Sequence, residues 1–146
     1  MSIQPGTYVI TNMASATNVA LPTYSDVVRT AQGWQQDSSY PTQQWVVNTT
    51  GSIPGSYTLQ CMDYGMYLQA ESLGANKTLI GSNVPAYWRL EKQVDNSYQI
   101  VYPGSYYVAE LANGSGTNAT PIQLAKKDTS NSVPTGKQRW NFVKLT

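Results

Sequence analysis

Three segments of this chain close in the same way, with a tryptophan inside a short run of strand-forming residues. They are QQWVV at 43–47, AYWRL at 86–90 and QRWNFV at 138–143. A matching segment opens each unit with a small or turn residue, a hydroxyl residue, a tyrosine, any residue and an aliphatic residue: GTYVI at 6–10, GSYTL at 55–59 and NSYQI at 96–100. Such self-similarity is typical of repeat architectures. The chain is therefore predicted to hold three repeats in one domain, at about 6–50, 55–93 and 96–146.

Strand signals dominate each repeat. Tyr, Val, Ile, Thr and Trp occur in short runs that are separated by Gly, Pro, Asn, Ser and Asp. No 11-residue window shows helical periodicity. Four strands are predicted in each repeat: 8–12, 18–21, 27–30 and 44–48, then 57–61, 67–70, 78–81 and 87–91, then 98–102, 107–111, 121–124 and 139–144. The fold is predicted to be all-β with twelve strands.

Three copies of four strands can close around a pseudo-threefold axis as a barrel capped by hairpins. Closure leaves no unpaired edge strand, which a soluble all-β chain must avoid. Within each opening strand, the tyrosine and the aliphatic residue two positions later lie on one face. Trp45, Trp88 and Trp140 are predicted to join them in the core, since aromatic side chains dominate core energetics. Gln43 and Gln138 are expected to bond to backbone within their own repeats.

Charge and terminal composition exclude several functions. Charged residues make up 12% of the chain and the formal net charge is +1, so no electrostatic basis for binding nucleic acid is present. Neither a signal-peptide pattern nor a run of about 18 apolar residues occurs, so we expect no membrane insertion and a cytoplasmic location. The one cysteine, Cys61, is expected to be a small core residue.

The composition also argues against catalysis. The chain has no histidine, which removes imidazole acid–base chemistry and the usual zinc ligand sets. Its eight carboxylates are scattered and form no run typical of a metal-binding loop. We therefore expect a binding protein without a metal or cofactor, and not an enzyme.

The three QxW-type repeats, together with the opening PGTYVITN at 5–12, resemble the ricin-B-type β-trefoil lectins, and in particular the small cytosolic lectins of mushroom fruiting bodies. The resemblance covers the chain from Gly6 to Leu145. It implies a β-trefoil fold and, less directly, carbohydrate binding to galactose- or N-acetylgalactosamine-type glycans.

In that family an Asp ending the second strand, an aromatic residue after the third strand and an Asn before the QxW motif contact the sugar. In repeat order, the Asp position holds Ala20, Gln69 and Glu110 in this chain. The aromatic position holds Ala31, Ser82 and Ala125, and the Asn position holds Thr42, Pro85 and Lys137. No repeat keeps the full set, and the second repeat is predicted to hold no site.

Two partial sites remain. In the first repeat, Trp34 lies in the long 31–42 segment and is either a stacking platform for a sugar or a packed loop anchor. The polar residues expected around it are Asp26, Gln36, Asp37 and Tyr40. In the third repeat, Glu110 offers two acceptor oxygens, and the residues expected beside it are Asn113, Asn118 and Gln138.

Two further hypotheses stay open. One is a lectin-like companion subunit without sugar binding, such as the light subunit of mushroom tyrosinase. The other is a β-trefoil protease inhibitor, with Arg29 or Lys127 entering a trypsin-like pocket. Glycans are the expected partners, and both a homodimer and a larger partner chain are open.

Overall fold

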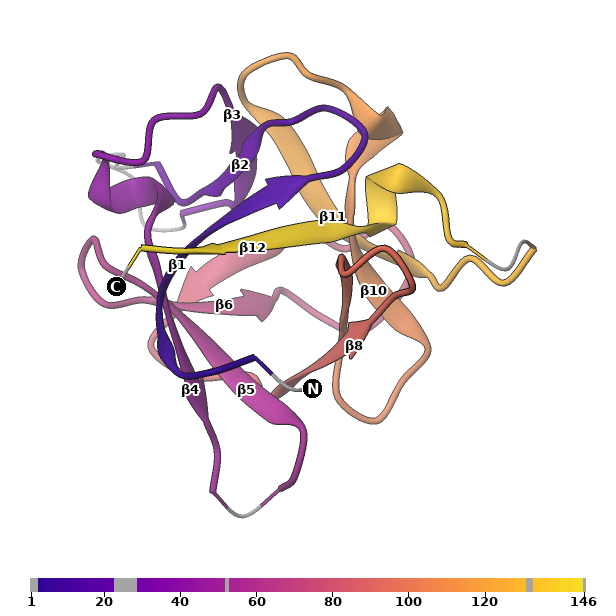
Figure 1. Cartoon of the computed structure of the whole chain (residues 1–146), viewed down its shortest axis with the longest axis horizontal. Coiled ribbons are helices and arrows are strands. Elements are labelled where there is room, and N and C mark those ends of the chain that lie inside the picture. Colours follow the sequence, from indigo (N-terminus) through magenta and orange to yellow (C-terminus); the bar gives the residue numbers. More distant parts are fainter. Residues whose placement is uncertain (1–2, 23–28, 52, 131–132, 146) are drawn as a thin grey trace.

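The computed structural model describes residues 3–22, 29–51, 53–130 and 133–145 (Figure 1). These residues form twelve strands and three short 3-10 helices, and no α-helix lies among them. The strands are β1 (Gly6–Asn12), β2 (Asn18–Ala20), β3 (Gln32–Trp34), β4 (Trp45–Thr49), β5 (Ser56–Cys61), β6 (Tyr67–Ala70), β7 (Leu79–Ser82), β8 (Trp88–Lys92), β9 (Tyr98–Val101), β10 (Tyr107–Leu111), β11 (Thr120–Lys126) and β12 (Trp140–Lys144). The 3-10 helices are η1 (Pro41–Gln43), η2 (Ala112–Gly114) and η3 (Gly136–Gln138). No helix in the described ranges has the length and apolar character needed to cross a membrane.

Six strands close into a barrel. Antiparallel pairing runs from β1 to β4, β5, β8, β9 and β12, and β12 pairs with β1 again, so the two lie side by side (Figure 1). The other six form the hairpins β2–β3, β6–β7 and β10–β11. These hairpins contact one another through β11–β3 pairing and through the isolated bridges Thr30–Ile80 and Thr78–Gln123. The architecture is a β-trefoil, which confirms the predicted all-β fold.

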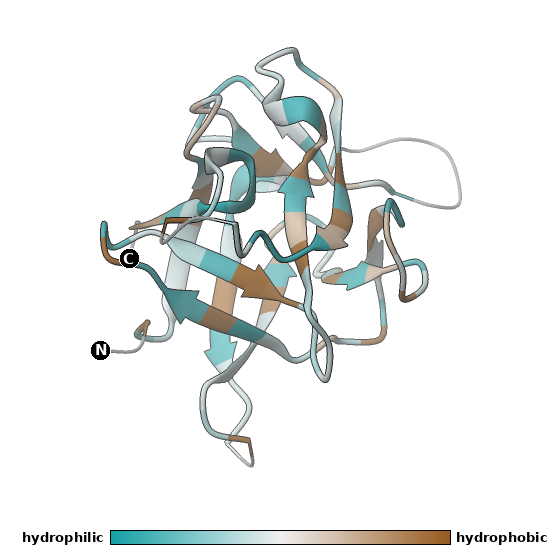
Figure 2. Cartoon of the chain, turned by 90° about the vertical axis from the view of Figure 1, so that its right-hand side faces the viewer, coloured by the Kyte–Doolittle hydropathy of each residue, from teal (hydrophilic) through white to brown (hydrophobic). Residues whose placement is uncertain are grey.

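The three repeated tryptophans lie at the centre of the core, as predicted. Trp45, Trp88 and Trp140 are fully buried. Each indole Nε1 donates to a carbonyl of the second strand in its own repeat, at 3.0 Å to Val19, 2.9 Å to Leu68 and 3.0 Å to Ala109. These bonds join each cap hairpin to the barrel. Figure 2 shows hydrophobic residues gathered mainly in the strands, with largely hydrophilic loops between them.

The third strand of the first repeat was predicted at the wrong position. Of the predicted 27–30 segment, residues 27 and 28 lie outside the described ranges, and Arg29 and Thr30 belong to no strand. The strand is instead β3, Gln32–Trp34, which pairs with β2. The β-branched run had favoured the earlier position, but tertiary pairing overrides strand propensity.

Close packing explains why a glycine, Gly33, stands in the middle of β3. A Cβ on Gly33 would lie 2.8 Å from Leu111 Cδ1 and 3.0 Å from Thr17 Oγ1, so only glycine fits without displacing its neighbours. Trp34 therefore follows this glycine at the end of a strand. It had been predicted to lie in a loop.

One buried amide in the barrel has no hydrogen-bond partner. Gln99 of β9 is fully buried, and the described structure offers no partner to its Oε1 or its Nε2. The matching positions in the other opening strands are Val9 and Thr58. Burying an amide without a partner costs about 1–3 kcal/mol in mutational data.

We expect Gln99→Met to raise the free energy of unfolding by about 1 kcal/mol in urea denaturation, because methionine fills a similar volume and needs no hydrogen bond. The matched control is Gln60→Met. Gln60 Nε2 donates to the Gly65 carbonyl at 2.9 Å, so the same change there is expected to lower stability by about 1 kcal/mol. A clear loss of stability in Gln99→Met would instead indicate a buried water bonded to the amide.

Candidate functional site

A cavity of about 730 Å³ opens beside the cap hairpin of the first repeat. Its walls come mainly from the ends of β2 and β3 and from the 35–43 segment that leads into β4. The second repeat contributes Asp63 and the third contributes Asn118. Three repeats therefore meet at a cavity that the sequence had assigned to one.

Two aromatic side chains of the described residues line this cavity. Trp34 is half-buried, and its indole Nε1 donates to Gln32 Oε1 at 3.1 Å, which restrains the ring. Tyr40 is 57% exposed. Ligand pockets are typically built from aromatic surface with a few well-placed polar groups, and these two rings supply that surface.

The 35–43 segment is held by one buried amide. Gln43 is 3% exposed, and its Oε1 accepts from the Asp37 N–H and from Asn18 Nδ2, both at 2.9 Å. Its Nε2 donates to the Gln35 carbonyl at 3.0 Å, which confirms the expected bonding to backbone. Asp37 Oδ1 accepts from the Ser39 N–H and hydroxyl. No hydrogen bond in the described structure engages Asp37 Oδ2, so this acceptor is open to a ligand.

Asn118 lies at the first-repeat cavity and not beside Glu110, where it had been predicted. Its Oδ1 accepts from the Gln35 N–H at 2.7 Å. The reason is the pairing of β11 with β3, which carries this third-repeat loop across to the first repeat. Gln36 also lines the cavity, and its Nε2 donates to the Ala16 carbonyl at 2.6 Å.

Of two carboxylates in this region of the chain, one was predicted from the sequence as a ligand contact and the other was not. Asp26, predicted as a contact, lies outside the described residues. Asp63 was missed, although it lines the cavity and its Oδ2 accepts from Arg29 Nη2 at 2.9 Å. No signal along the sequence connects the loop after β5 with the first-repeat cap, so only the fold brings Asp63 here.

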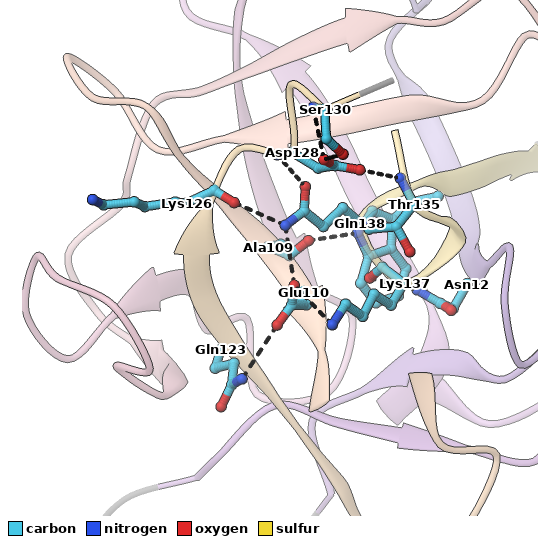
Figure 3. Close-up of polar contacts among 11 residues, drawn as sticks. Asn12, Ala109, Glu110, Gln123, Lys126, Asp128, Ser130, Thr135, Lys137 and Gln138 are labelled. Atoms are coloured by element: carbon cyan, nitrogen blue, oxygen red, sulfur yellow. Dashed lines mark hydrogen bonds and ion pairs between the residues drawn. The ribbon is translucent and has the colours of Figure 1, made fainter. Parts of the chain in front are cut away.

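The predicted third-repeat site is occupied by the chain itself (Figure 3). Glu110 is 7% exposed and therefore buried. Its Oε1 accepts from Gln138 Nε2 at 3.0 Å and lies 3.8 Å from Lys137 Nζ, while its Oε2 accepts from Gln123 Nε2 at 3.4 Å. Asn113 is exposed on η2 and joins none of these bonds. Glu110 and Gln138 are brought together as predicted, but in an internal network.

The loop before β12 has the same construction as the first-repeat loop. Gln138 Oε1 accepts from the Asp128 N–H at 2.8 Å and Nε2 donates to the Lys126 carbonyl at 2.9 Å. The Ser130 hydroxyl and backbone N–H groups hold the pKa of Asp128 below its usual value. Here Asp128 Oδ2 accepts from the Thr135 N–H at 2.9 Å, so neither carboxylate oxygen stays open (Figure 3). The first-repeat loop thus leaves a carboxylate oxygen, Asp37 Oδ2, for a ligand, whereas the loop before β12 leaves neither oxygen of Asp128.

In the second repeat, Gln69 occupies the position that Glu110 has in the third, and its side-chain amide is fully hydrogen-bonded within the chain. Gln69 Nε2 lies 3.3 Å from the carbonyls of Val84 and Pro85, and Oε1 accepts from the Tyr102 hydroxyl at 3.0 Å. That the second repeat holds no site stays a prediction.

Of the two basic residues considered for a protease pocket, one is buried and the other is paired at the surface. Arg29 is 4% exposed, and its guanidinium binds Asp63 and backbone carbonyls. Lys127 Nζ forms an ion pair with Glu91. Burial raises the pKa of Glu91, but hydrogen bonds from Lys127 and Arg89 outweigh it and leave that pKa below its usual value. Among the described residues, no cluster of three or more side chains could hold a metal ion.

The fold and these loops define a β-trefoil protein with a concave site at its cap. Residues 41–125 match the model of the ricin-type beta-trefoil lectin domain-like family. The chain belongs to this family. A comparison with curated proteins found no significant match.

Solved structures extend the similarity over nearly the whole chain. A ricin B-like lectin from Macrolepiota procera, solved in complex with lactose, is 27% identical with a TM-score of 0.84, and the alignment covers 99% of this chain and 100% of that one. The Rhizoctonia solani agglutinin is 22% identical with a TM-score of 0.87, covering 99% of each chain. A proteinase inhibitor from Coprinopsis cinerea, 15% identical with a TM-score of 0.76, covers 99% of this chain and all of its own length, and shares the fold.

Proposed function

We propose that this chain is a non-catalytic lectin, a single β-trefoil domain that binds galactose- or N-acetylgalactosamine-type glycans in the first-repeat cavity. The observation that carries the proposal is the meeting of Trp34 and Tyr40 with Asp37 at one concave surface. Family membership and the likeness to a lectin solved with lactose support carbohydrate binding.

The cavity offers the two kinds of contact that a sugar ring needs. The C–H face of a pyranose packs on an aromatic ring, and Trp34 and Tyr40 provide such rings. The hydroxyls need fixed acceptors and donors. Asp37 Oδ2 is an acceptor held in place by the Gln43 network, and the amide of Asn118 adds a donor to the same cavity. Preorganised groups of this kind lose little entropy on binding.

The carboxylate that accepts from the sugar hydroxyls stands at a different position here than in the family. Ala20 stands where the family carries an Asp, and its small buried side chain lines the cavity without offering a polar atom. Within the described ranges, Asp37 and Asp63 are the carboxylates that line the same cavity. We therefore assign the hydroxyl contacts to the 35–43 loop, while Asp63 of the same cavity is held by Arg29.

The geometry also suggests how such a lectin would act. One shallow site gives modest affinity, and joining sites in a homodimer raises the effective concentration of the second binding event. Agglutination is therefore expected only if copies associate or the glycan surface is dense.

A glycan array with the wild type and Trp34→Ala tests the proposal. We expect the wild type to bind terminal galactose, N-acetylgalactosamine or lactosamine glycans. Trp34→Ala should weaken binding by at least about 30-fold, which corresponds to the roughly 2 kcal/mol typical of a tryptophan hot spot. Thermal unfolding of the same variant should change little, because Trp34 is half-buried and lies outside the tryptophan core.

The control is Glu110→Gln, which alters the internal network of the third repeat and should leave glycan binding unchanged. Binding that survives Trp34→Ala but falls in Glu110→Gln would place the site in the third repeat. A blank array for the wild type would refute the lectin proposal and favour a companion subunit, to be sought by co-purification with a larger chain.

A further inference from the structure

A second cavity, of about 510 Å³, adjoins the first. Gln35, Gln36 and Asn118 line both cavities, so the two meet along these side chains. The remaining wall comes from Ser15, Ala16 and Thr17 of the β1–β2 turn and from Gly116 of the loop before β11. The same three side chains therefore form the boundary between the two cavities.

The chemistry of the second cavity is polar and uncharged. Among the described residues, no Asp, Glu, Lys or Arg lines it. The hydroxyls of Ser15 and Thr17 lie 2.7 Å apart and bond to each other. At the boundary, Gln36 Nε2 and Asn118 Oδ1 are bonded to the chain, whereas Gln36 Oε1 and Asn118 Nδ2 have no partner in the described structure. An acceptor and a donor are thus available between the cavities.

We propose that the two cavities together bind a neutral oligosaccharide of at least two sugar residues. One ring stacks on Trp34 and Tyr40 in the first cavity, and the next crosses between Gln36 and Asn118 into the second. The proposal rests on the proposed lectin function and adds to it the length and charge of the glycan.

The sizes of the cavities support an extended ligand. A cavity of about 300–1,000 Å³ is enough to hold a whole small-molecule ligand. Each of the two lies within this range, so together they exceed what a single sugar ring requires.

The charges support a neutral ligand. An anionic sugar residue in the second cavity would lose its hydration without gaining a cation, and an ionised group that is desolvated without a partner is strongly disfavoured. In the first cavity the charged lining residues are the carboxylates Asp37 and Asp63, of which Asp63 already neutralises Arg29. Sialylated or sulfated glycans therefore gain nothing from this surface.

Gly116→Leu blocks the second cavity selectively. A Cβ on Gly116 would meet no atom closer than 3.9 Å, namely Cβ and the carbonyl oxygen of Ser15, and the Gly116 φ lies outside the left-handed region. A leucine is therefore tolerated and projects beside Ser15, which lines the second cavity. The matched control is Ser72→Leu, which adds the same side chain at an exposed position that lines neither cavity.

Isothermal titration calorimetry with methyl β-galactoside, with the neutral tetrasaccharide lacto-N-neotetraose and with sialyllactose tests the proposal. The wild type and Ser72→Leu should bind the tetrasaccharide about tenfold more tightly than the monosaccharide, the gain from one or two hydrogen bonds of ordinary net strength. Gly116→Leu should lose this gain and keep its monosaccharide affinity. Sialyllactose should bind no more tightly than the monosaccharide.

Several outcomes overturn the extended site. They are equal wild-type affinity for the tetrasaccharide and the monosaccharide, an undiminished tetrasaccharide gain in Gly116→Leu, and a preference for sialyllactose.

If Gly116→Leu fails to fold, NMR of the wild type decides, because the amide signals of Ser15 and Gly116 should shift with the tetrasaccharide and not with the monosaccharide. Loss of binding in Trp34→Ala with no effect of Gly116→Leu would overturn the extended site alone. Absence of all glycan binding would overturn the proposed function with it.

Discussion

Trp140→Ala is expected to lower the free energy of unfolding by about 3–5 kcal/mol, the range for large-to-small changes of a buried aromatic residue. Trp140 is fully buried in the core cluster shared by all three repeats. The substitution removes that packing and also leaves the Ala109 carbonyl without its indole donor. Denaturant unfolding followed by circular dichroism measures the loss.

Trp140→Phe separates the two causes. Phenylalanine keeps most of the apolar volume but cannot donate to Ala109, so a smaller loss, of about 1–3 kcal/mol, is expected. A loss below about 1 kcal/mol in Trp140→Ala would contradict the assignment of this tryptophan to the core. Trp88→Ala should behave like Trp140→Ala, because its Nε1 makes the equivalent bond to Leu68.

Arg29→Ala is expected to cost about 3 kcal/mol of stability, since removing one partner of a buried ion pair leaves polar groups uncompensated. The guanidinium donates to the Asp63 carboxylate and to the carbonyls of Leu21 and Pro22, and its carbon lies 5.3 Å from the centre of the Tyr64 ring. These contacts join the first-repeat cap to the loop after β5. Thermal and denaturant unfolding are the measurements.

Asp63→Asn is the matched control. It removes the charge of the partner but leaves Arg29 bonded to backbone carbonyls, so the expected cost is smaller, about 1 kcal/mol. If Arg29→Ala costs no more than Asp63→Asn, the backbone contacts of the guanidinium contribute little. A stable Arg29→Ala variant that loses inhibition of trypsin would revive the inhibitor hypothesis, which the burial of Arg29 opposes.

The spacing of tryptophans and opening tyrosines predicted the fold because it reflects packing that each repeat carries out in the same way. Trp45 and Trp140 occupy equivalent positions, and each donates to a carbonyl of the second strand in its own repeat. The bonding of Gln43 and Gln138 is equally local, joining each to the loop that precedes it. Such contacts recur at similar separations along the chain, so the sequence displays them as a repeat.

The candidate site depends on contacts that no local pattern contains. Asn118 reaches the first-repeat cavity because β11 pairs with β3. Asp63 of the second repeat reaches the same cavity because its carboxylate binds Arg29 of the first repeat. Trp34, Gln36 and Asp37 could be predicted together from the sequence, since they are neighbours along one segment, whereas Asn118 was predicted beside Glu110.

The order of residues along the chain was thus enough to predict the all-β trefoil, its tryptophan core and the aromatic segment of the first repeat. The tertiary structure alone decided which carboxylates are open to a ligand. Glu110 and Asp37 look alike as acidic residues in a sequence, yet Glu110 is buried against Gln123, Lys137 and Gln138. Burial and pairing depend on groups brought together from distant positions, and these fix whether a polar side chain serves the fold or faces a ligand.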